Sequence, residues 1–265
     1  MKELIEILRE GYGFENCDLE KNDDSTDGNV YIAKLLKKKY VIKIYDNYSH
    51  TIAMVKLHDF LISSNINVPK IISTTDSKKY YRINKNKYCV VYSFLEGEQI
   101  TNIWKNDSKT LTPLIAKEVR KIHNLTLNNN SFKLKEVPFK INNNIKRCSV
   151  LHFDLTKDNI FYNTNFSNDI GFIDFDDAKY GPCVVEISII LSLLFITKSK
   201  GLDKTGMYNF LDEYYGDDIE LKELEIPYIK NIAVEWVTYI LNNNNFDTST
   251  TESFEIKKEL MEIKL

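Results

Sequence analysis

The stretch of sequence that decides the fold is residues 151–162, which read LHFDLTKDNIFY. It contains His152, then Asp154, and Asn159 five residues further on. An acid and an amide held on a short loop between apolar residues can align a hydroxyl group and hold a metal ion. By itself this spacing carries little information, because Asp and Asn are common in ordinary loops. Its meaning depends on the segments that lie next to it in the chain.

A second element lies at residues 170–177, which read IGFIDFDD. Two short apolar runs, at 160–162 and 170–175, flank a polar segment, and this pattern predicts a β-hairpin. The hairpin places Asp174 at the end of its return strand, where the carboxylate can offer hard oxygen ligands to Mg²⁺. Asp176 and Asp177 either extend such a metal shell or cap the next turn.

The composition describes an ordinary globular protein with two lobes. The 265 residues are 43% hydrophobic and 28% charged, and the net charge of -3 gives no general attraction for nucleic acid. Residues 1–10 predict an amphipathic helix rather than a signal peptide, and no segment is apolar enough to span a membrane. The four scattered cysteines match neither a zinc site nor a disulfide framework. We therefore expect reduced thiols in a cytoplasmic protein.

The pattern of apolar residues changes at residues 93–97. Before this boundary, and after the opening helix, it predicts antiparallel strands and one further helix, at 28–34, 40–45, 50–64, 80–83 and 88–94. Beyond it the periodicity is helical, at 111–125 and from 184 onward, apart from the hairpin. The prediction is an α+β fold with an N-terminal lobe at 1–94, built on an antiparallel sheet with a helix, and a mainly helical C-terminal lobe at 95–265 that carries the hairpin.

The loop at 152–159 has the spacing of the protein-kinase catalytic loop, H-R-D-x-x-x-x-N, with Phe153 in place of the Arg. Together with residues 172–177 (FIDFDD) and 40–45 (YVIKIY), it resembles the aminoglycoside phosphotransferase and choline kinase superfamily. That Arg is commonly absent in this superfamily, so Phe153 favours a small-molecule kinase over a protein kinase. The resemblance covers most of residues 25–190.

The same resemblance extends to residues 66–69 (INVP) and 122–125 (IHNL). It implies a bilobal protein-kinase-like fold and an enzyme that moves the γ-phosphoryl group of ATP or GTP to a hydroxyl of a small molecule. It further implies that Asp154 is the catalytic residue, and that Asn159 and Asp174 bind Mg²⁺. The N-terminal lobe would then bind the nucleotide, and the C-terminal lobe would carry the catalytic and acceptor-binding residues.

Nucleotide-binding residues are implied in the N-terminal lobe. Lys43 lies in an alternating strand, VIKI, where its side chain faces either solvent or a cleft. The resemblance implies that it holds the α- and β-phosphates. Gly28 and Asn29 are candidates for a turn over the phosphates, although no complete G-x-G-x-x-G is present. A hinge whose backbone binds adenine is implied at Tyr92, Ser93 and Phe94, residues that also fit a buried strand.

The sequence departs from the superfamily at one position. Members usually carry a Glu on the N-lobe helix that pairs with the strand Lys, but residues 54–56 read MVK. Lys43 would then be oriented by Asp174 or the phosphates alone, or the enzyme is impaired. Glu186 matches an acid that the family often has after the metal loop, which predicts contacts to the catalytic loop. His123 has no carboxylate nearby in the sequence and predicts a structural role.

The acceptor is left open by the sequence. Acids and aromatic residues in the C-terminal lobe fit either a site for a cationic ligand or ordinary solvated faces and core, namely Asp212, Glu213, Tyr214, Tyr215, Glu235 and Trp236. Four acceptors remain candidates, namely an aminoglycoside, which would imply antibiotic resistance, choline, homoserine and a macrolide. A nucleotide-binding pseudokinase is the alternative to an active enzyme. We expect a monomer or weak dimer whose partners are a nucleoside triphosphate and a small-molecule alcohol, without nucleic acid or membrane.

Overall fold

The chain forms two compact units. The computed structural model describes residues 1–22, 29–126, 132–139, 141, 144–164, 169–197 and 201–243. Unit 1 comprises Met1–Glu96 with Asn130–Lys133, and unit 2 comprises Gly97–Asn129 with Leu134–Leu265. Each unit has fully buried hydrophobic residues of its own, such as Ile42 in unit 1 and Ile189 in unit 2.

Unit 1 is an antiparallel sheet with two helices. The helices are α1 (Lys2–Tyr12) and α2 (Tyr48–Ser63). The strands are β1 (Asp18–Lys21), β2 (Val30–Leu35), β3 (Lys38–Tyr45), β4 (Ile71–Ile72), β5 (Tyr81–Arg82) and β6 (Tyr88–Ser93). Their order is β1-β2-β3-β6-β4, and β5 also pairs with β6. The predicted hairpin, helix and strand pair are therefore confirmed, and the edge strands β1 and β4 are additions to the prediction.

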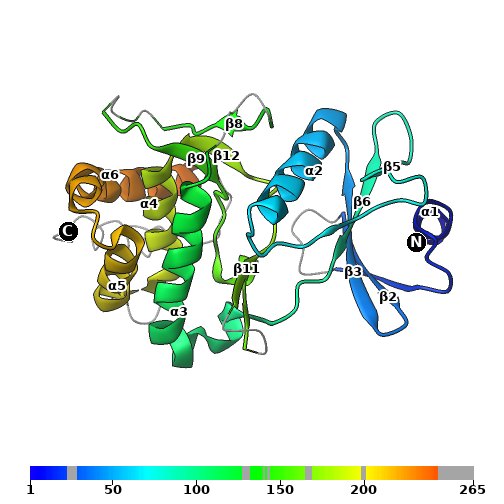
Figure 1. Ribbon diagram of the computed structural model, residues 1–265, viewed down its shortest axis with the longest axis horizontal. Helices are drawn as coiled ribbons and strands as arrows, with labels where there is room; N and C mark the ends of the chain where they lie inside the picture. Colours follow the sequence, from blue (N-terminus) through cyan, green and yellow to red (C-terminus); the bar gives the residue numbers. More distant parts are fainter. Residues whose placement is uncertain are drawn as a thin grey trace. The chain divides into compact units, whose positions relative to one another are not determined.

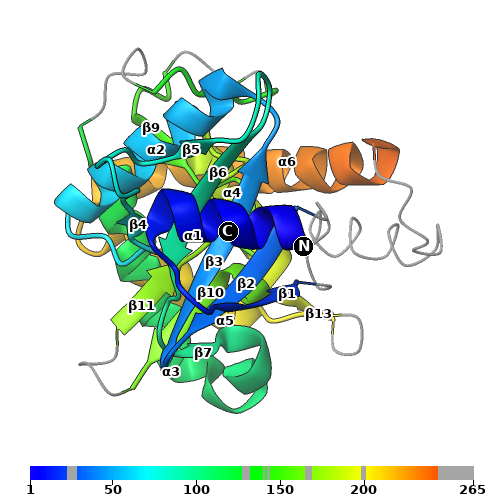
Figure 2. The same cartoon turned by 90° about the vertical axis from the view of Figure 1, so that its right-hand side faces the viewer.

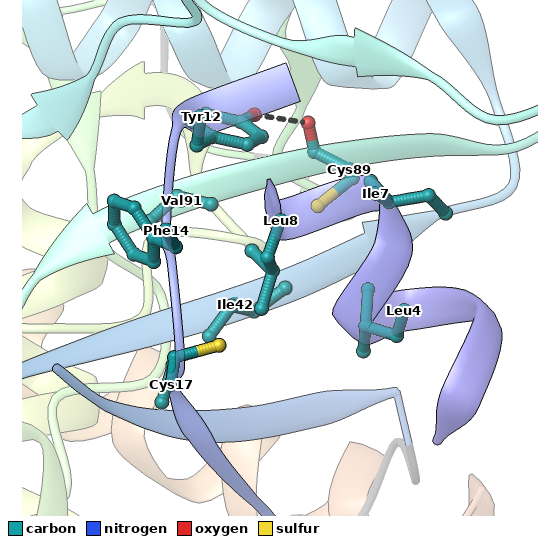
Figure 3. Packing of buried hydrophobic residues seen from close by; sticks show 10 residues of the cluster. Leu4, Ile7, Leu8, Tyr12, Phe14, Cys17, Ile42, Cys89 and Val91 are labelled. Carbon is teal, nitrogen blue, oxygen red and sulfur yellow. Dashed lines mark hydrogen bonds between the residues drawn. The ribbon is translucent and has the colours of Figure 1, made fainter. Parts of the chain in front are cut away.

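Helix α1 covers one face of this sheet. Because side chains alternate along a strand, Ile42 of β3 points to the same face as Ala33, Cys89 and Val91, and all four pack against α1. Leu8 is fully buried there, which contributes about 2 kcal/mol. The hydroxyl of Tyr12 donates to the carbonyl of Cys89 at 2.9 Å. Figure 1 shows α1 and α2 on opposite faces, Figure 2 shows α1 crossing the strands, and Figure 3 shows the cluster.

Unit 2 is mainly helical. Its helices are α3 (Ile100–His123), α4 (Cys183–Leu194), α5 (Lys204–Tyr215) and α6 (Ile219–Asn243). Its strands are β7 (Glu98–Gln99), β8 (Lys135–Glu136), β9 (Cys148–Leu151), β10 (Ile160–Asn163), β11 (Asp169–Phe172), β12 (Lys179–Pro182), β13 (Ile196–Thr197) and β14 (Gly201–Leu202). A short 3₁₀ helix, η2 (Lys157–Asn159), precedes β10. Helix α3 packs on α5, and α4 packs on α6 (Figure 1). The predicted fold class is confirmed.

Helix α3 begins at Ile100, well before the helical pattern predicted to start at residue 111. The early part reads ITNIWKNDSKT, which is rich in β-branched and polar residues of low helix propensity. Pro113 also interrupts the hydrogen-bond ladder inside the helix. Burial of Ile100 and Trp104, one helical turn apart, holds this segment against unit 2. Tertiary packing therefore overrides a weak local preference.

Two short sheets bring the two motifs together. Strand β10 pairs with β11 so that Ile160 faces Phe172, which confirms the predicted hairpin. Strand β9 pairs with β12 so that Leu151 faces Lys179, a pairing that the sequence pattern did not predict. Because β9 and β10 enter and leave residues 152–159, while β11 and β12 flank residues 173–178, these pairings place the two loops side by side.

A glycine fixes the start of unit 2. Gly97 has φ +124°, and a Cβ atom there would lie 2.7 Å from the carbonyl oxygen of Tyr162. Strand β7, which comes directly after it, pairs with β10 on the side opposite β11. Only glycine allows the chain to enter unit 2 at this point.

The helices of the described ranges contain no segment that is both long and apolar enough to cross a membrane. Helix α4 is among the most completely buried, but it has 12 residues, whereas a membrane span needs about 20. All four cysteines are free thiols.

Candidate active site

The loop at 152–159, here called the catalytic loop, holds Asp154 and Asn159 in direct contact. The side-chain nitrogen of Asn159 donates to the carbonyl of Asp154 at 2.8 Å and to its carboxylate at 3.0 Å. The backbone of the loop closes with two further bonds, from Thr156 to Asp154 and from Asn159 to Thr156. Both hydrogen bonds to Asp154 use the side-chain nitrogen of Asn159, which leaves the side-chain oxygen of Asn159 for another partner.

His152 joins the catalytic loop to the segment that carries Asp174. Its ring is fully buried, and Nε2 donates to the carbonyl of Ile173 at 2.7 Å. The N–H of Ile173 in turn donates to the carbonyl of Asn159 at 3.0 Å. The ring of Phe175, also fully buried, lies 4.3 Å from that of His152. Both backbone groups of the residue before Asp174 are therefore fixed by the catalytic loop.

Phe153 occupies a backbone conformation that bulky residues rarely adopt. Its φ is +71°, and such a conformation costs on the order of 1–3 kcal/mol unless its surroundings impose it. The N–H of Phe153 donates to Oε1 of Glu186 at 2.7 Å, which confirms the predicted contact of Glu186 with the loop. The ring packs against Trp236 with 5.2 Å between ring centroids. These contacts hold the turn that presents Asp154.

His123 supports Glu186 from the end of α3. Its Nε2 lies 2.9 Å from Oε2 of Glu186, and both side chains are buried. No sequence pattern marks this pair, because the two residues lie on different helices and are 63 positions apart. His123 therefore does have a carboxylate partner, and its role is to hold Glu186.

Acidic residues crowd the two loops. Asp174 is exposed and has φ +65°, a conformation that Asp tolerates better than most residues. Burial raises the pKa of Asp154, and the negative charges of Asp174 and Asp177 raise it further, whereas His152 and the bond from Asn159 oppose the shift. The negative charges of Asp174 and Asp177 therefore act on the carboxylate of Asp154.

The oxygen donors of Asp174 and Asn159 fit a Mg²⁺ ion that is also bound by substrate phosphates. Among the described residues, no three His, Cys, Asp or Glu side chains gather closely enough to cage a metal by themselves. Mg²⁺ is usually bound through one or two carboxylates together with phosphate oxygens and water. The carboxylate of Asp174 and the amide oxygen of Asn159 are hard ligands of this kind. The binding of Mg²⁺ by these two residues stays a prediction.

Lys43 lies in unit 1, on the sheet face that α2 covers. Its neighbour Ile42 points toward α1, so Lys43 points the other way. On this face the hydroxyls of Tyr45 and Tyr92 lie 3.0 Å apart, and the ring of His58 from α2 lies 4.9 Å from that of Tyr92. Lys43 is half-buried. The solvent-facing alternative is therefore disfavoured.

Helix α2 has no acid at the position where the resemblance implies a Glu. Its buried residues include Met54 and His58, and its one carboxylate, Asp59, pairs with Lys79 at the surface. The departure noted in the sequence thus persists in the fold.

The described members of the remaining nucleotide candidates lie in the strands or next to them, and their backbone groups bond within the sheet. The carbonyl of Asn29 accepts the N–H of Ile44, which extends the β2–β3 ladder, and Gly28 lies outside the described residues. The N–H groups of Ser93 and Phe94 donate to the carbonyls of Lys70 and Lys39. Tyr92 is buried within β6. An adenine hinge would therefore have to use groups other than these two amides.

Comparisons with known proteins agree with this geometry. The model of the Phosphotransferase enzyme family (APH) matches residues 144–216, a span that contains the catalytic loop, Asp174 and Glu186. The chain has the fold of the aminoglycoside phosphotransferases. Both the predicted resemblance and the predicted kinase-like fold are confirmed. No curated protein matches the sequence.

Solved structures of small-molecule kinases share this aminoglycoside phosphotransferase fold. An amicoumacin kinase in complex with AMP-PNP, Ca²⁺ and Ami has TM-score 0.67 and 14% identity, over 98% of this chain and 92% of that one. A spectinomycin phosphotransferase in complex with ADP and spectinomycin has TM-score 0.66 and 18% identity, over 97% and 93%. An ethanolamine kinase of Plasmodium vivax has TM-score 0.60 and 17% identity, over 92% and 80%.

Proposed function

We propose that this protein transfers the γ-phosphoryl group of ATP or GTP to a hydroxyl group of a small molecule, with Asp154 as the residue that receives the hydroxyl proton. The observation that carries the proposal is the clamp around the catalytic loop. Asn159 holds the carboxylate of Asp154, while His152 and Asn159 fix the residue before Asp174. Phosphoryl transfer depends on positioning and electrostatic stabilisation, which such a clamp supplies.

The carboxylate of Asp154 has the position and the environment of a proton acceptor. It is partly exposed, whereas the residues on either side of it, Phe153 and Leu155, are buried. Burial raises its pKa, which strengthens it as a base while the hydrogen bond from Asn159 stabilises the ionised form. Asp154 would orient the acceptor hydroxyl and take its proton late in the transfer.

Mg²⁺ would be held by Asn159 and Asp174, where it neutralises phosphate charge. Lys43 would bind the α- and β-phosphates from the α2 face of unit 1. Helix α2 offers no acid at the position where the resemblance implies a Glu.

The acceptor is a small molecule that carries a hydroxyl. The names of the structural neighbours include antibiotics and ethanolamine, so an antibiotic and a short amino alcohol head the panel to be tested. Tyr214, Tyr215 and Trp236 are buried in the core of unit 2. Asp212 and Glu213 line a shallow groove of about 390 Å³, but they already pair with Lys222 and Lys117. Glu235 is exposed and remains a candidate for contact with a cationic acceptor.

A pseudokinase is the second candidate, and the missing acid on α2 is the observation that favours it. A binding-only protein has less need of the clamped proton acceptor. Release of ADP or GDP, measured with aminoglycosides, macrolides, choline, ethanolamine, homoserine and sugars, separates the two. Acceptor-stimulated release supports the enzyme. Metal-dependent nucleotide binding without stimulated release across the panel would favour the pseudokinase.

A further inference from the structure

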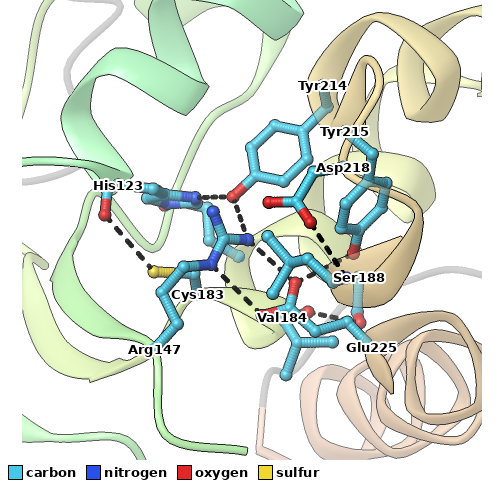
Figure 4. Close-up of polar contacts among 11 residues, drawn as sticks. His123, Arg147, Cys183, Val184, Ser188, Tyr214, Tyr215, Asp218 and Glu225 are labelled. Carbon is cyan, nitrogen blue, oxygen red and sulfur yellow. Dashed lines mark hydrogen bonds and ion pairs between the residues drawn. The ribbon is translucent and has the colours of Figure 1, made fainter. Parts of the chain in front are cut away.

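A chain of buried polar side chains runs from the C-terminal helices of unit 2 to the catalytic loop. Tyr214 at the end of α5 lies 2.6 Å from Nδ1 of His123 and 2.7 Å from Nη2 of Arg147. Arg147 in turn pairs with Glu225 of α6. Figure 4 shows the hydroxyl of Tyr214 between His123 and Arg147. Nothing in the proposed chemistry uses Tyr214, Arg147 or Glu225.

The hydrogen bonds of this chain have one consistent direction. Arg147 can only donate, so the Tyr214 oxygen accepts from it. The carboxylate of Glu186 accepts from Nε2 of His123, so in a neutral ring Nδ1 is the acceptor and the Tyr214 hydroxyl donates to it. Nε2 of His123 then carries the ring proton and donates to Oε2 of Glu186, whose Oε1 accepts the N–H of Phe153. Burial raises the pKa of Tyr214 well above its ordinary value, so the hydroxyl keeps its proton. The direction assigns one tautomer to His123.

The far end of the chain is firmly anchored. Arg147 donates to Glu225 through Nε at 3.2 Å and through Nη2 at 2.8 Å. Glu225 is 1% exposed, so an unpaired charge there would be costly. The hydroxyl of Tyr214 is therefore held by Arg147, which is itself fixed by a bidentate ion pair with Glu225 of α6.

We propose that Tyr214 is a positioning residue for Asp154, an inference that rests on the proposed phosphoryl transfer. Its hydroxyl fixes the ring of His123, and the ring fixes the carboxylate of Glu186. That carboxylate holds Phe153 at φ +71°, which sets the direction of Asp154. The effect passes through backbone geometry, so Tyr214 touches neither nucleotide nor acceptor.

Tyr215 provides a matched control. It is equally buried, and its hydroxyl donates to Oε2 of Glu225 at 3.0 Å. Its ring lies 5.0 Å from that of Tyr214. Tyr214→Phe and Tyr215→Phe therefore each remove one buried hydroxyl that contacts the same ion pair, but only the first breaks the bond to His123.

The kinetic test compares the two variants with wild type, using MgATP and whichever panel acceptor is turned over. We expect Tyr214→Phe to lower kcat about tenfold at nearly unchanged KM for ATP, because small displacements of reacting groups are costly. The kcat of Tyr215→Phe should stay within about twofold of the wild-type value, because the reacting groups stay in place. Equal changes of kcat in the two variants would overturn the proposal, since they would show a general loss of packing.

Hydrogen exchange supplies a readout that does not depend on the chemistry. The backbone amide of Phe153 should exchange faster in Tyr214→Phe than in Tyr215→Phe, because its acceptor Glu186 loses the support of His123. Equal protection in both variants would contradict the coupling. If wild type turns over no acceptor, the proposed function fails, and this exchange comparison alone decides whether Tyr214 holds the loop.

Discussion

The two units hold their candidate site residues in different ways. In unit 2, Asp154 and Asp174 stand on loops, and Asn159 ends the short helix η2. The backbone around them is bonded to side chains such as Glu186 and His152. In unit 1, Lys43 lies within a continuous ladder, with Val30 and Val90 opposite it on the neighbouring strands. A ladder fixes where a residue lies through the backbone alone. The catalytic loop instead depends on particular buried side chains.

This difference makes the two units respond differently to substitution. A change in unit 2 that removes a supporting carboxylate moves the reacting groups and lowers kcat. A change at Lys43 leaves the sheet in place and removes only a charge, so it weakens nucleotide binding. Variants at Asp174, Glu186 and Lys43 test whether these consequences are in fact separate.

The largest of these effects is expected at Asp174. Asp174→Asn should lower turnover on the order of 1000-fold, because a bound cation supplies several kcal/mol of transition-state stabilisation. It should also weaken the metal dependence of nucleotide binding, measured by calorimetry with and without Mg²⁺. Asp169→Asn, at the other end of β11, is the control. Turnover close to wild type in Asp174→Asn would remove Asp174 from the metal site.

The next effect is expected at Glu186. Glu186→Ala leaves the Phe153 N–H and His123 without their acceptor in a buried place, which costs about 3–5 kcal/mol of stability. Its kcat should fall about 100-fold through misplacement of Asp154. Glu186→Gln keeps an oxygen for Phe153 and should lose less of both. Thermal melts and steady-state rates check the order, and a Gln variant as impaired as Ala would refute it.

A smaller effect is expected at Lys43. Lys43→Met should raise the KM for ATP about tenfold, the loss of one charged hydrogen bond, with kcat changed less. Lys34→Met is the matched control, because Lys34 lies on the adjacent strand and pairs with Glu20 at the surface. If Lys43→Met lowered kcat as much as Glu186→Ala does, the two units would not differ in the way described.

The smallest effect is on stability. Because burial raises the pKa of Asp154, the folded protein holds this proton more tightly than the unfolded chain does. The stability that this group contributes is therefore fully present below its unfolded pKa of about 3.9. It is lost as the pH rises through the higher pKa of Asp154 in the folded protein. Asp154→Asn should raise Tm at pH 7 and leave it unchanged at pH 3.5. A Tm that falls at pH 7 would contradict this.

The same shift has a consequence for activity. Since ionised Asp154 accepts the proton, turnover should decline on the acid side at a higher pH than the ordinary pKa of Asp would give. A pH–rate profile of wild type with the accepted substrate measures this. An acid limb at or below the ordinary value would show that Asp154 does not limit the rate there.

The parts of the site that the sequence predicted are those whose partners are local. Asp154 and Asn159 contact each other within one loop, and the hairpin joins them to Asp174 over a short distance. Strands β2, β3, β5 and β6 of unit 1 were predicted from their β-branched and aromatic runs, whereas the short edge strands β1 and β4 were not. In such cases the residue pattern and the contact have the same cause.

The parts that were missed depend on distant packing. The pairing of β9 with β12, the first part of α3, and the chain from Arg147 to His123 all join segments far apart in the sequence. No local pattern marks them, because a buried Tyr or His looks like any core residue. Phe153 at positive φ was also unforeseen, since its conformation is imposed by Glu186 and Trp236 rather than by its own preference.

The most direct test of the account is ADP release by Asp154→Asn, with MgATP and the accepted substrate. Asp158→Asn is the control, because Asp158 is an exposed acid of the same loop. We predict that Asp154→Asn loses turnover by about 1000-fold, within the range of a lost general base, while its affinity for MgATP stays near wild type. Near-normal turnover in Asp154→Asn would contradict the assignment of Asp154 as the proton acceptor.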